Sequence, residues 1–154
     1  MIQRVQSIFF LLAAAMMSAL FSKPMAFATI FGDAAALRAS DQSMLADGVF
    51  EVNDHIILLG LVIACIALPM ISLLLFKNRS LQIRLSRATI AALCVLLALS
   101  IILFMQDYKL MSDGTEVTIE YGYISPVLAI IFIVLALRFI KKDDRLVKSA
   151  DRLR

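Results

Sequence analysis

A stretch of 21 residues, Ile56 to Phe76, carries no charged side chain. Fourteen of these residues are Leu, Ile, Val or Phe. At about −0.3 to −0.6 kcal/mol each, they contribute roughly −4 to −8 kcal/mol toward membrane insertion. Because about 20 apolar residues cross a hydrocarbon layer of ~30 Å, we predict a membrane-spanning helix over about residues 55–76. With 62% of 154 residues hydrophobic, the chain has more apolar side chains than one small soluble core can hide.

The connector that follows, residues 77–87, contains four basic residues and no acid, which places it in the cytoplasm by the positive-inside rule. Of the 15 basic residues, 12 fall on segments predicted to be cytoplasmic, and nine of the 12 acids fall on segments predicted to lie outside. Membrane orientation therefore explains the formal charge of +3, and we expect no nucleic-acid partner.

Three further helices are predicted, over about residues 4–23, 87–106 and 122–140, so the chain reads as one transmembrane domain, residues 1–154. The first apolar run has a second interpretation, a cleavable secretory signal that ends at Ala26-Phe27-Ala28. Its length, and Lys23 and Pro24 before that site, favour retention. Gly60 and Ala64 in the second helix have a spacing that allows close approach of a neighbouring helix.

The two outer loops, residues 23–54 and 107–121, contain strand and turn patterns. Tyr108 to Met111 and the β-prone residues Val117 to Tyr121 flank a Ser-Asp-Gly turn, which predicts a hairpin. A lone hairpin is marginal in water, so we expect Val49 to Val52 to join it as a third strand. The predicted fold class is an all-α membrane protein, a four-helix transmembrane bundle with a small extracytoplasmic β-hairpin or sheet cap.

The sequence contains few of the residue patterns that are typical of catalytic or metal-binding sites. The chain has one histidine, His55, and two cysteines, Cys65 and Cys94, both inside apolar runs. A Ser-His-Asp or Cys-His catalytic set is therefore not expected, nor are phosphate loops, zinc sites or calcium loops, and we predict no cofactor. We interpret His55 as a polar residue that ends a helix, with a pH-sensitive pair or one metal ligand as the alternative. No ionisable group falls deep within the four apolar runs, which argues against an ion pathway in one copy.

The tail, residues 141–154, is strongly charged, and Leu146, Ala150 and Leu153 recur on one side of a continued helix. We predict a cytoplasmic C-terminal amphipathic helix. Its basic residues and those of the inner loop, residues 77–87, are topogenic, or they form a docking face for anionic lipid or a partner. Arg4 can pair with Asp151 and Asp144 with Lys148. The candidate partner- or lipid-binding residues are Gln3, Arg4, Gln6, Arg145, Lys148, Asp151, Arg152 and Arg154.

The two ends of the chain, Met1-Ile2-Gln3-Arg4-Val5-Gln6 and the run from Lys142 to Arg154, resemble the bacterial domain of unknown function family 4293, small integral membrane proteins. The resemblance implies a four-helix bundle in the cytoplasmic membrane of a bacterium with an uncleaved first helix. It implies no activity and supplies no catalytic residues.

We therefore expect a non-enzymatic accessory or scaffolding subunit in the bacterial inner membrane, with both termini cytoplasmic. Membrane lipid and a membrane-protein partner are its expected contacts. The alternative is a small transporter or channel formed by homo-oligomerisation through small-residue faces. A membrane enzyme ranks third and would need a polar cleft around His55 and the acids of the outer loops.

Overall fold

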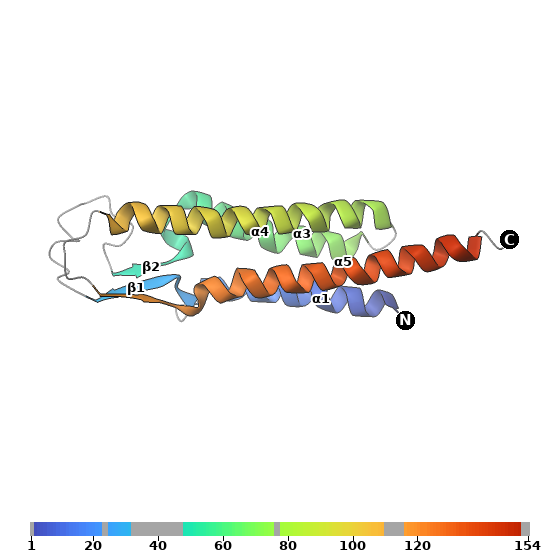
Figure 1. Ribbon diagram of the computed structural model, residues 1–154, viewed down its shortest axis with the longest axis horizontal. Helices are drawn as coiled ribbons and strands as arrows, with labels where there is room; N and C mark the ends of the chain where they lie inside the picture. Colours follow the sequence, from blue (N-terminus) through green and yellow to red (C-terminus); the bar gives the residue numbers. More distant parts are fainter. Residues whose placement is uncertain (1, 23–24, 32–47, 76–77, 110–115, 152–154) are drawn as a thin grey trace.

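The computed structural model describes the backbone of residues 2–22, 25–31, 48–75, 78–109 and 116–151. Side chains are described over the same ranges except at residues 2–4, 31, 107, 116 and 146–151. Four long helices lie side by side, and a small sheet sits at one end (Figure 1). We call this the sheet end. The opposite end, where α3 turns into α4 and both termini lie, is called the basic end.

The four predicted helices are present, with shifted ends. They are α1 (Ile2–Ser18, extended by the 3-10 turn η1, Ala19–Phe21), α3 (Ile56–Leu74), α4 (Arg79–Tyr108) and α5 (Ile124–Asp151). α4 begins well before residue 87 because Asn78 caps it, its Oδ1 accepting the Leu81 N–H at 3.3 Å. α5 runs unbroken into the charged tail, as the spacing of Leu146 and Ala150 predicted.

The helices pack as a ring in which α1 contacts α3 and α5, and α4 also contacts α3 and α5. Buried positions recur at alternating intervals of four and three residues, the spacing of left-handed helix packing. On α3 they are Leu58, Val62, Cys65, Pro69 and Ser72, and on α4 they include Gln82, Ser86, Thr89, Leu93, Leu96 and Ser100. Gly60 lies off this stripe, exposed, and an added Cβ there would meet nothing within 4 Å. The predicted close contact at Gly60 is therefore absent within one copy.

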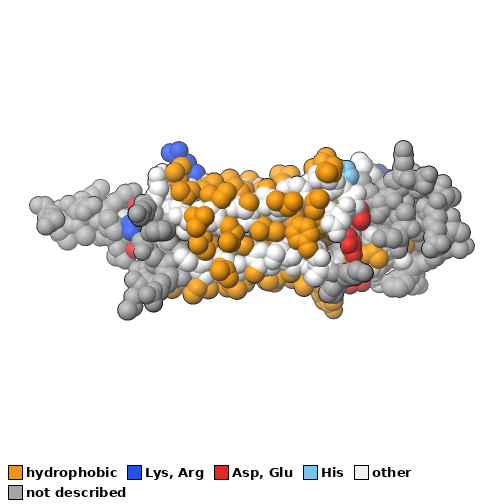
Figure 2. Space-filling view, turned by 180° about the vertical axis from the view of Figure 1, so that it is seen from behind, with side chains coloured by type: hydrophobic (Ala, Val, Ile, Leu, Met, Phe, Trp, Pro, Cys, Tyr) orange, Lys and Arg blue, Asp and Glu red, His pale blue; other side chains and the backbone are white. Residues whose placement is uncertain are grey.

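An apolar belt surrounds the middle of the molecule. Within the described residues, three helical segments are long and apolar enough to cross a membrane, namely Ile56–Leu74, Arg79–Gln106 and Tyr121–Arg145, and the apolar helix Val5–Phe21 is shorter. Figure 2 shows hydrophobic side chains over this belt, Lys and Arg at one end of it, and Asp, Glu and His at the other. The belt is compatible with a membrane protein.

The sheet has three antiparallel strands in the order β2 (Val49–Phe50), β1 (Ala28–Phe31) and β3 (Glu116–Ile119). The small sheet is thus confirmed, and in it β3 pairs with β1, from Ala28 opposite Ile119 to Phe31 opposite Glu116. Of the first predicted hairpin arm, Tyr108 ends α4 instead of starting a strand, and the rest of the arm and the turn fall at residues 110–115, outside the described residues. The second predicted arm and Val49–Phe50 do form strands, on either side of a β1 that was not predicted.

Backbone hydrogen bonds join β1 to the segments beside it. Phe27 N–H donates to the Phe50 carbonyl at 2.9 Å, and Gly122 N–H donates to the Ala26 carbonyl at 2.9 Å. Gly122 has to be glycine at this close approach, since a Cβ would lie 2.5 Å from the Ala26 carbonyl oxygen. Ala26, Phe27 and Ala28, the residues of the alternative signal-cleavage site, are all buried.

Candidate functional site

Most of the terminal residues proposed from the sequence have side chains outside the described residues. Gln3 and Arg4 fall in the first turns of α1, and Lys148 and Asp151 fall in the last turns of α5. The side chains of these four lie outside the described residues, as do Arg152 and Arg154 entirely, so the Arg4–Asp151 and Asp144–Lys148 pairs are not described. α5 extends past the start of α1 at the basic end (Figure 1).

The other two proposed residues occupy different environments. Gln6 is only 6% exposed and packs inside the helix ring, whereas Arg145 is exposed. Lys141 and Lys142 are exposed beside Arg145 along the same helix. Among the proposed residues with a described side chain, Arg145 is exposed and can contact a partner or a lipid headgroup, whereas Gln6 packs in the interior of the helix ring.

The basic end is closed by side chains that the sequence reasoning did not single out. Gln82 is buried, and its Nε2 donates to the Ser72 carbonyl at 3.1 Å. That carbonyl belongs to the last turn of α3, so the bond joins the end of α3 to the start of α4. Arg79 and Asp143 form an ion pair at 2.8 Å that links the start of α4 to α5.

The other sequence candidates have structural roles. His55 is the N-cap of α3, and its Nδ1 accepts the Ile57 N–H at 3.2 Å, which agrees with its interpretation as a helix-ending residue. Asp54 accepts the Glu51 N–H, part of a capping box around the 3-10 turn η3 (Val52–Asp54). Cys65 is buried in the core and Cys94 is exposed on α4. Among the described residues, no group of three His, Cys, Asp or Glu side chains is arranged to hold a metal ion.

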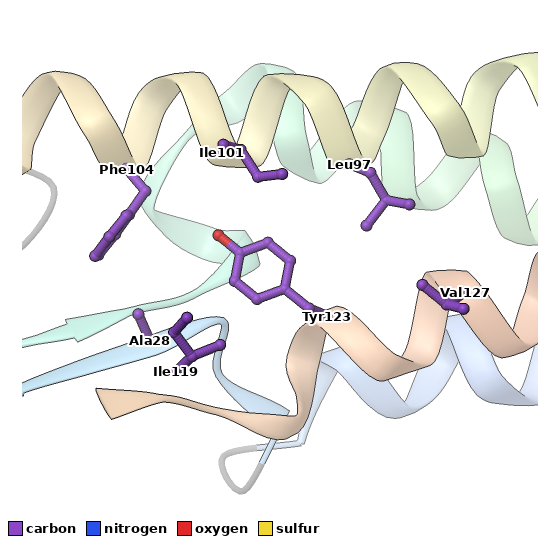
Figure 3. A pocket seen from close by; sticks show the side chains of 7 residues that line it. All are labelled: Ala28, Leu97, Ile101, Phe104, Ile119, Tyr123 and Val127. Atoms are coloured by element: carbon purple, nitrogen blue, oxygen red, sulfur yellow. The ribbon is translucent and has the colours of Figure 1, made fainter. Parts of the chain in front are cut away.

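An apolar pocket of about 530 Å³ lies at the sheet end, between α4, α5 and the sheet. Figure 3 shows the Tyr123 ring at its centre, with side chains of α4 on one side and those of the strands on the other. Tyr123 belongs to the 3-10 turn η4 (Tyr121–Tyr123), which leads into α5. The lining residues are Ala28, Leu97, Ile101, Phe104, Ile119, Tyr123 and Val127.

The pocket offers almost no polar surface to a ligand. Its one side-chain polar atom is the Tyr123 hydroxyl, which hydrogen-bonds with Ser100 on α4. Ile101, Val127 and Ile119 are exposed, so the pocket opens on the side of the molecule rather than being sealed inside it. Such a site can hold an apolar group.

The pocket could not be found from the sequence because its walls come from segments up to 99 positions apart, Ala28 and Val127 being the extremes. The strand pattern of Ala28 to Phe31 was the one available signal, and it coincided with the alternative signal-cleavage motif.

Comparison with known proteins places the chain in a family without an assigned activity. No curated protein and no solved structure matches it. The sequence profile of one family, described as a domain of unknown function, matches residues 2–153, which is nearly the whole chain. The chain therefore belongs to the domain of unknown function family DUF4293.

Proposed function

We propose that the chain is a multi-pass protein of the bacterial cytoplasmic membrane that serves as a non-enzymatic accessory or scaffolding subunit. In this proposal α1, α3, α4 and α5 each cross the bilayer, and both termini lie in the cytoplasm. The observation that carries the proposal is the single unbroken helix α5, which combines an apolar, membrane-length segment with a charged extension.

The charges at the two ends support this orientation. Among residues with described side chains, the first turns of α4 and the last turns of α5 carry seven basic residues and two acids, Asp143 and Asp144, whereas the acids Glu51, Asp54 and Glu120 lie beside the sheet; the basic residues are Arg79, Arg84, Arg87, Arg138, Lys141, Lys142 and Arg145. Among the described residues, Lys109 is the basic residue that lies at the sheet end. Because Lys and Arg are retained on the cytoplasmic side during insertion, the basic end is assigned to the cytoplasm.

The length of α5 supports a scaffolding role. Its 28 residues span about 42 Å at 1.5 Å per residue, against a hydrocarbon layer of ~30 Å. Two turns or more thus stand beyond the bilayer when the apolar part is centred in it. α5 continues as one helix past the Arg79–Asp143 ion pair, so the extension is a helical arm with Lys141, Lys142 and Arg145 exposed on it.

The polar side chains inside the helix ring favour the scaffolding role over an ion pathway through one copy of the chain. The buried polar side chains among the described residues are amides and hydroxyls, and the hydroxyls of Ser72, Ser86 and Thr89 donate back to carbonyls of their own helices. Such bonds satisfy the hydroxyl locally and need no solute. Ion and proton paths commonly use ionisable groups instead.

The test is partner recovery from membranes. The full chain is cross-linked in membranes, purified in mild detergent and analysed by mass spectrometry, beside a variant with Lys141, Lys142 and Arg145 changed to Ala. We expect a co-purifying membrane protein whose yield falls at least about tenfold in the triple variant. The matched control, Lys109→Ala, removes an exposed base at the other end and should leave the yield unchanged.

A reporter fused after Arg154 accompanies each variant, because loss of three bases at one end also weakens the signal for orientation. Its accessibility only from the periplasmic side in the unmodified chain would contradict the proposed topology. Recovery of the chain alone, across several detergents and after cross-linking, would contradict the scaffolding role.

A further inference from the structure

The pocket at the sheet end lies at a definite depth along the helices. Its α4 wall runs from Leu97 to Phe104, seven residues or about 10 Å along the axis. Both residues fall in the candidate span Arg79–Gln106, and Val127 falls in the candidate span Tyr121–Arg145. Leu97, the α4 lining residue furthest from the sheet end, lies about 14 Å along the helix from Gln106, less than half of a ~30 Å hydrocarbon layer, so the pocket belongs to the leaflet at the sheet end.

The sheet closes one end of the pocket. Ala28 and Ile119 are opposite each other on β1 and β3, and their side chains point toward the Tyr123 ring (Figure 3). Beyond them the Thr29 hydroxyl is hydrogen-bonded to the Thr118 hydroxyl at 2.6 Å and to a Glu120 carboxylate oxygen at 2.9 Å. The polar side of the sheet thus faces away from the pocket, and the apolar side roofs it.

The helices do not close over the pocket because their spacing is fixed at the sheet end. The hydroxyl of Ser125 donates to the Met16 carbonyl, which ties α5 to the end of α1. The Tyr123 hydroxyl reaches Ser100 on α4. These contacts position the start of α5 between α1 and α4, and the apolar lining beside Tyr123, from Ile101 to Val127, is left for another group to cover.

We propose that the pocket binds one acyl chain of a phospholipid from the leaflet at the sheet end. This inference rests on the proposed membrane location. The lateral opening past Ile101 and Val127 faces hydrocarbon in a bilayer, and the volume of about 530 Å³ lies within the ~300–1,000 Å³ of typical ligand pockets. With the Tyr123 hydroxyl already bonded, the lining favours a pure hydrocarbon group over a polar solute. Ile119, 76% exposed at the mouth, marks the level at which the chain passes toward its headgroup.

The experiment counts lipid that stays on the protein. The full chain is purified from membranes in mild detergent, and native mass spectrometry measures the retained phospholipid. Ile101→Trp fills the pocket, while Ile102→Trp adds the same bulk to the neighbouring residue, which does not line it; the two isoleucines are 47% and 53% exposed. We expect one phospholipid per chain in the unmodified protein and in Ile102→Trp, and at least about tenfold less in Ile101→Trp.

A second pair keeps the test decisive if Ile101→Trp does not fold. Val127→Trp also enters the pocket, and Ile131→Trp, one turn further along α5 and similarly exposed, does not. Circular dichroism confirms helix content in all four. Equal retention in both members of each pair, no phospholipid on the unmodified chain, or a retained free fatty acid in its place would each overturn the proposal.

The outcomes separate this inference from the proposed function. If the chain co-purifies with a protein partner but retains no lipid, only the acyl-chain site is contradicted. If it retains a lipid but no protein partner, only the scaffolding role is contradicted. Release of the chain from membranes by alkaline carbonate would contradict both proposals.

Discussion

The two ends of the molecule are held together by different kinds of contact. At the sheet end, backbone hydrogen bonds join segments far apart in the sequence, such as Phe27 to Phe50 and Ala26 to Gly122. At the basic end, the described hydrogen bonds are local to the α3–α4 turn, and side chains make the distant contacts: the Arg79–Asp143 ion pair joins α4 to α5, and the Phe9 ring stacks on that of Phe139 at 5.6 Å. The sheet end is therefore a frame of backbone hydrogen bonds, whereas side chains join the distant segments at the basic end.

This difference accounts for what each end offers. The frame sets helix spacing tightly enough to keep an apolar pocket open beside Tyr123. The basic end leaves α5 able to run on as an arm to Asp151. The predictions below test whether stability is concentrated at the sheet end, from the largest expected effect to the smallest.

Phe27→Ala should have the largest effect on stability. Phe27 is fully buried, and its ring lies 5.6 Å from that of Phe50 and 5.0 Å from that of Tyr123. Loss of such a side chain costs about 3–5 kcal/mol. Thermal unfolding in detergent, followed by circular dichroism, measures it. The exposed Phe21→Ala is the control, and equal losses for the two variants would show that the aromatic cluster does not hold the frame.

Gly122→Ala tests the close approach beside β1. The added Cβ would lie 2.5 Å from the Ala26 carbonyl oxygen, and backbone cannot yield as a flexible side chain does. We expect a loss of about 2–3 kcal/mol. Gly60→Ala is the matched control, because its Cβ meets nothing within 4 Å and alanine favours helix by roughly 0.5–1 kcal/mol. Similar unfolding temperatures for both variants would contradict this geometry.

Gln82→Leu tests the local closure of the basic end. The substitution keeps the volume but leaves the Ser72 carbonyl without its side-chain donor. The expected cost is about 1–2 kcal/mol, in the range measured for buried hydrogen bonds between membrane helices. Gln106→Leu, at an exposed position of α4, serves as the control. A loss as large as that of Phe27→Ala would remove the contrast between the two ends.

The Arg79–Asp143 pair should contribute least. The two side chains are 28% and 17% exposed, so water and salt weaken the attraction. A double-mutant cycle with Arg79→Gln and Asp143→Asn should give a coupling energy of about 0.5–1 kcal/mol that shrinks further in 1 M salt. A coupling of several kcal/mol, insensitive to salt, would mean that the basic end is as firmly fixed as the sheet end.

The helices were predictable and their pairing was not. Uncharged runs such as Ile56 to Phe76 identify an apolar helix directly, because in lipid almost every side is apolar. For the same reason hydropathy cannot say which side faces a neighbour. The available signal was the run of Gln82, Ser86 and Thr89 at intervals of four and three, since buried polar residues mark the packed stripe.

The sheet and the pocket were harder to predict. Tyr108 to Met111 looked like a hairpin arm, yet α4 continues through Tyr108, where its ring stacks on Phe104 at 6.1 Å. An i,i+4 contact within α4 thus supports the helix past the point at which the strand pattern was expected to begin. The pocket depends on how β1, β3, α4 and α5 meet, and no single segment carries that information.

The central place of β1 has a consequence for biosynthesis. Thr29 pairs with Thr118, 89 residues later, so a chain emerging from the ribosome exposes the middle strand long before its second neighbour exists. An unpaired strand edge invites association with other chains until it is covered. Synthesis of β3, just before the last helix, supplies the strand that covers this edge, and chains that stop short of it would keep the edge exposed to proteases.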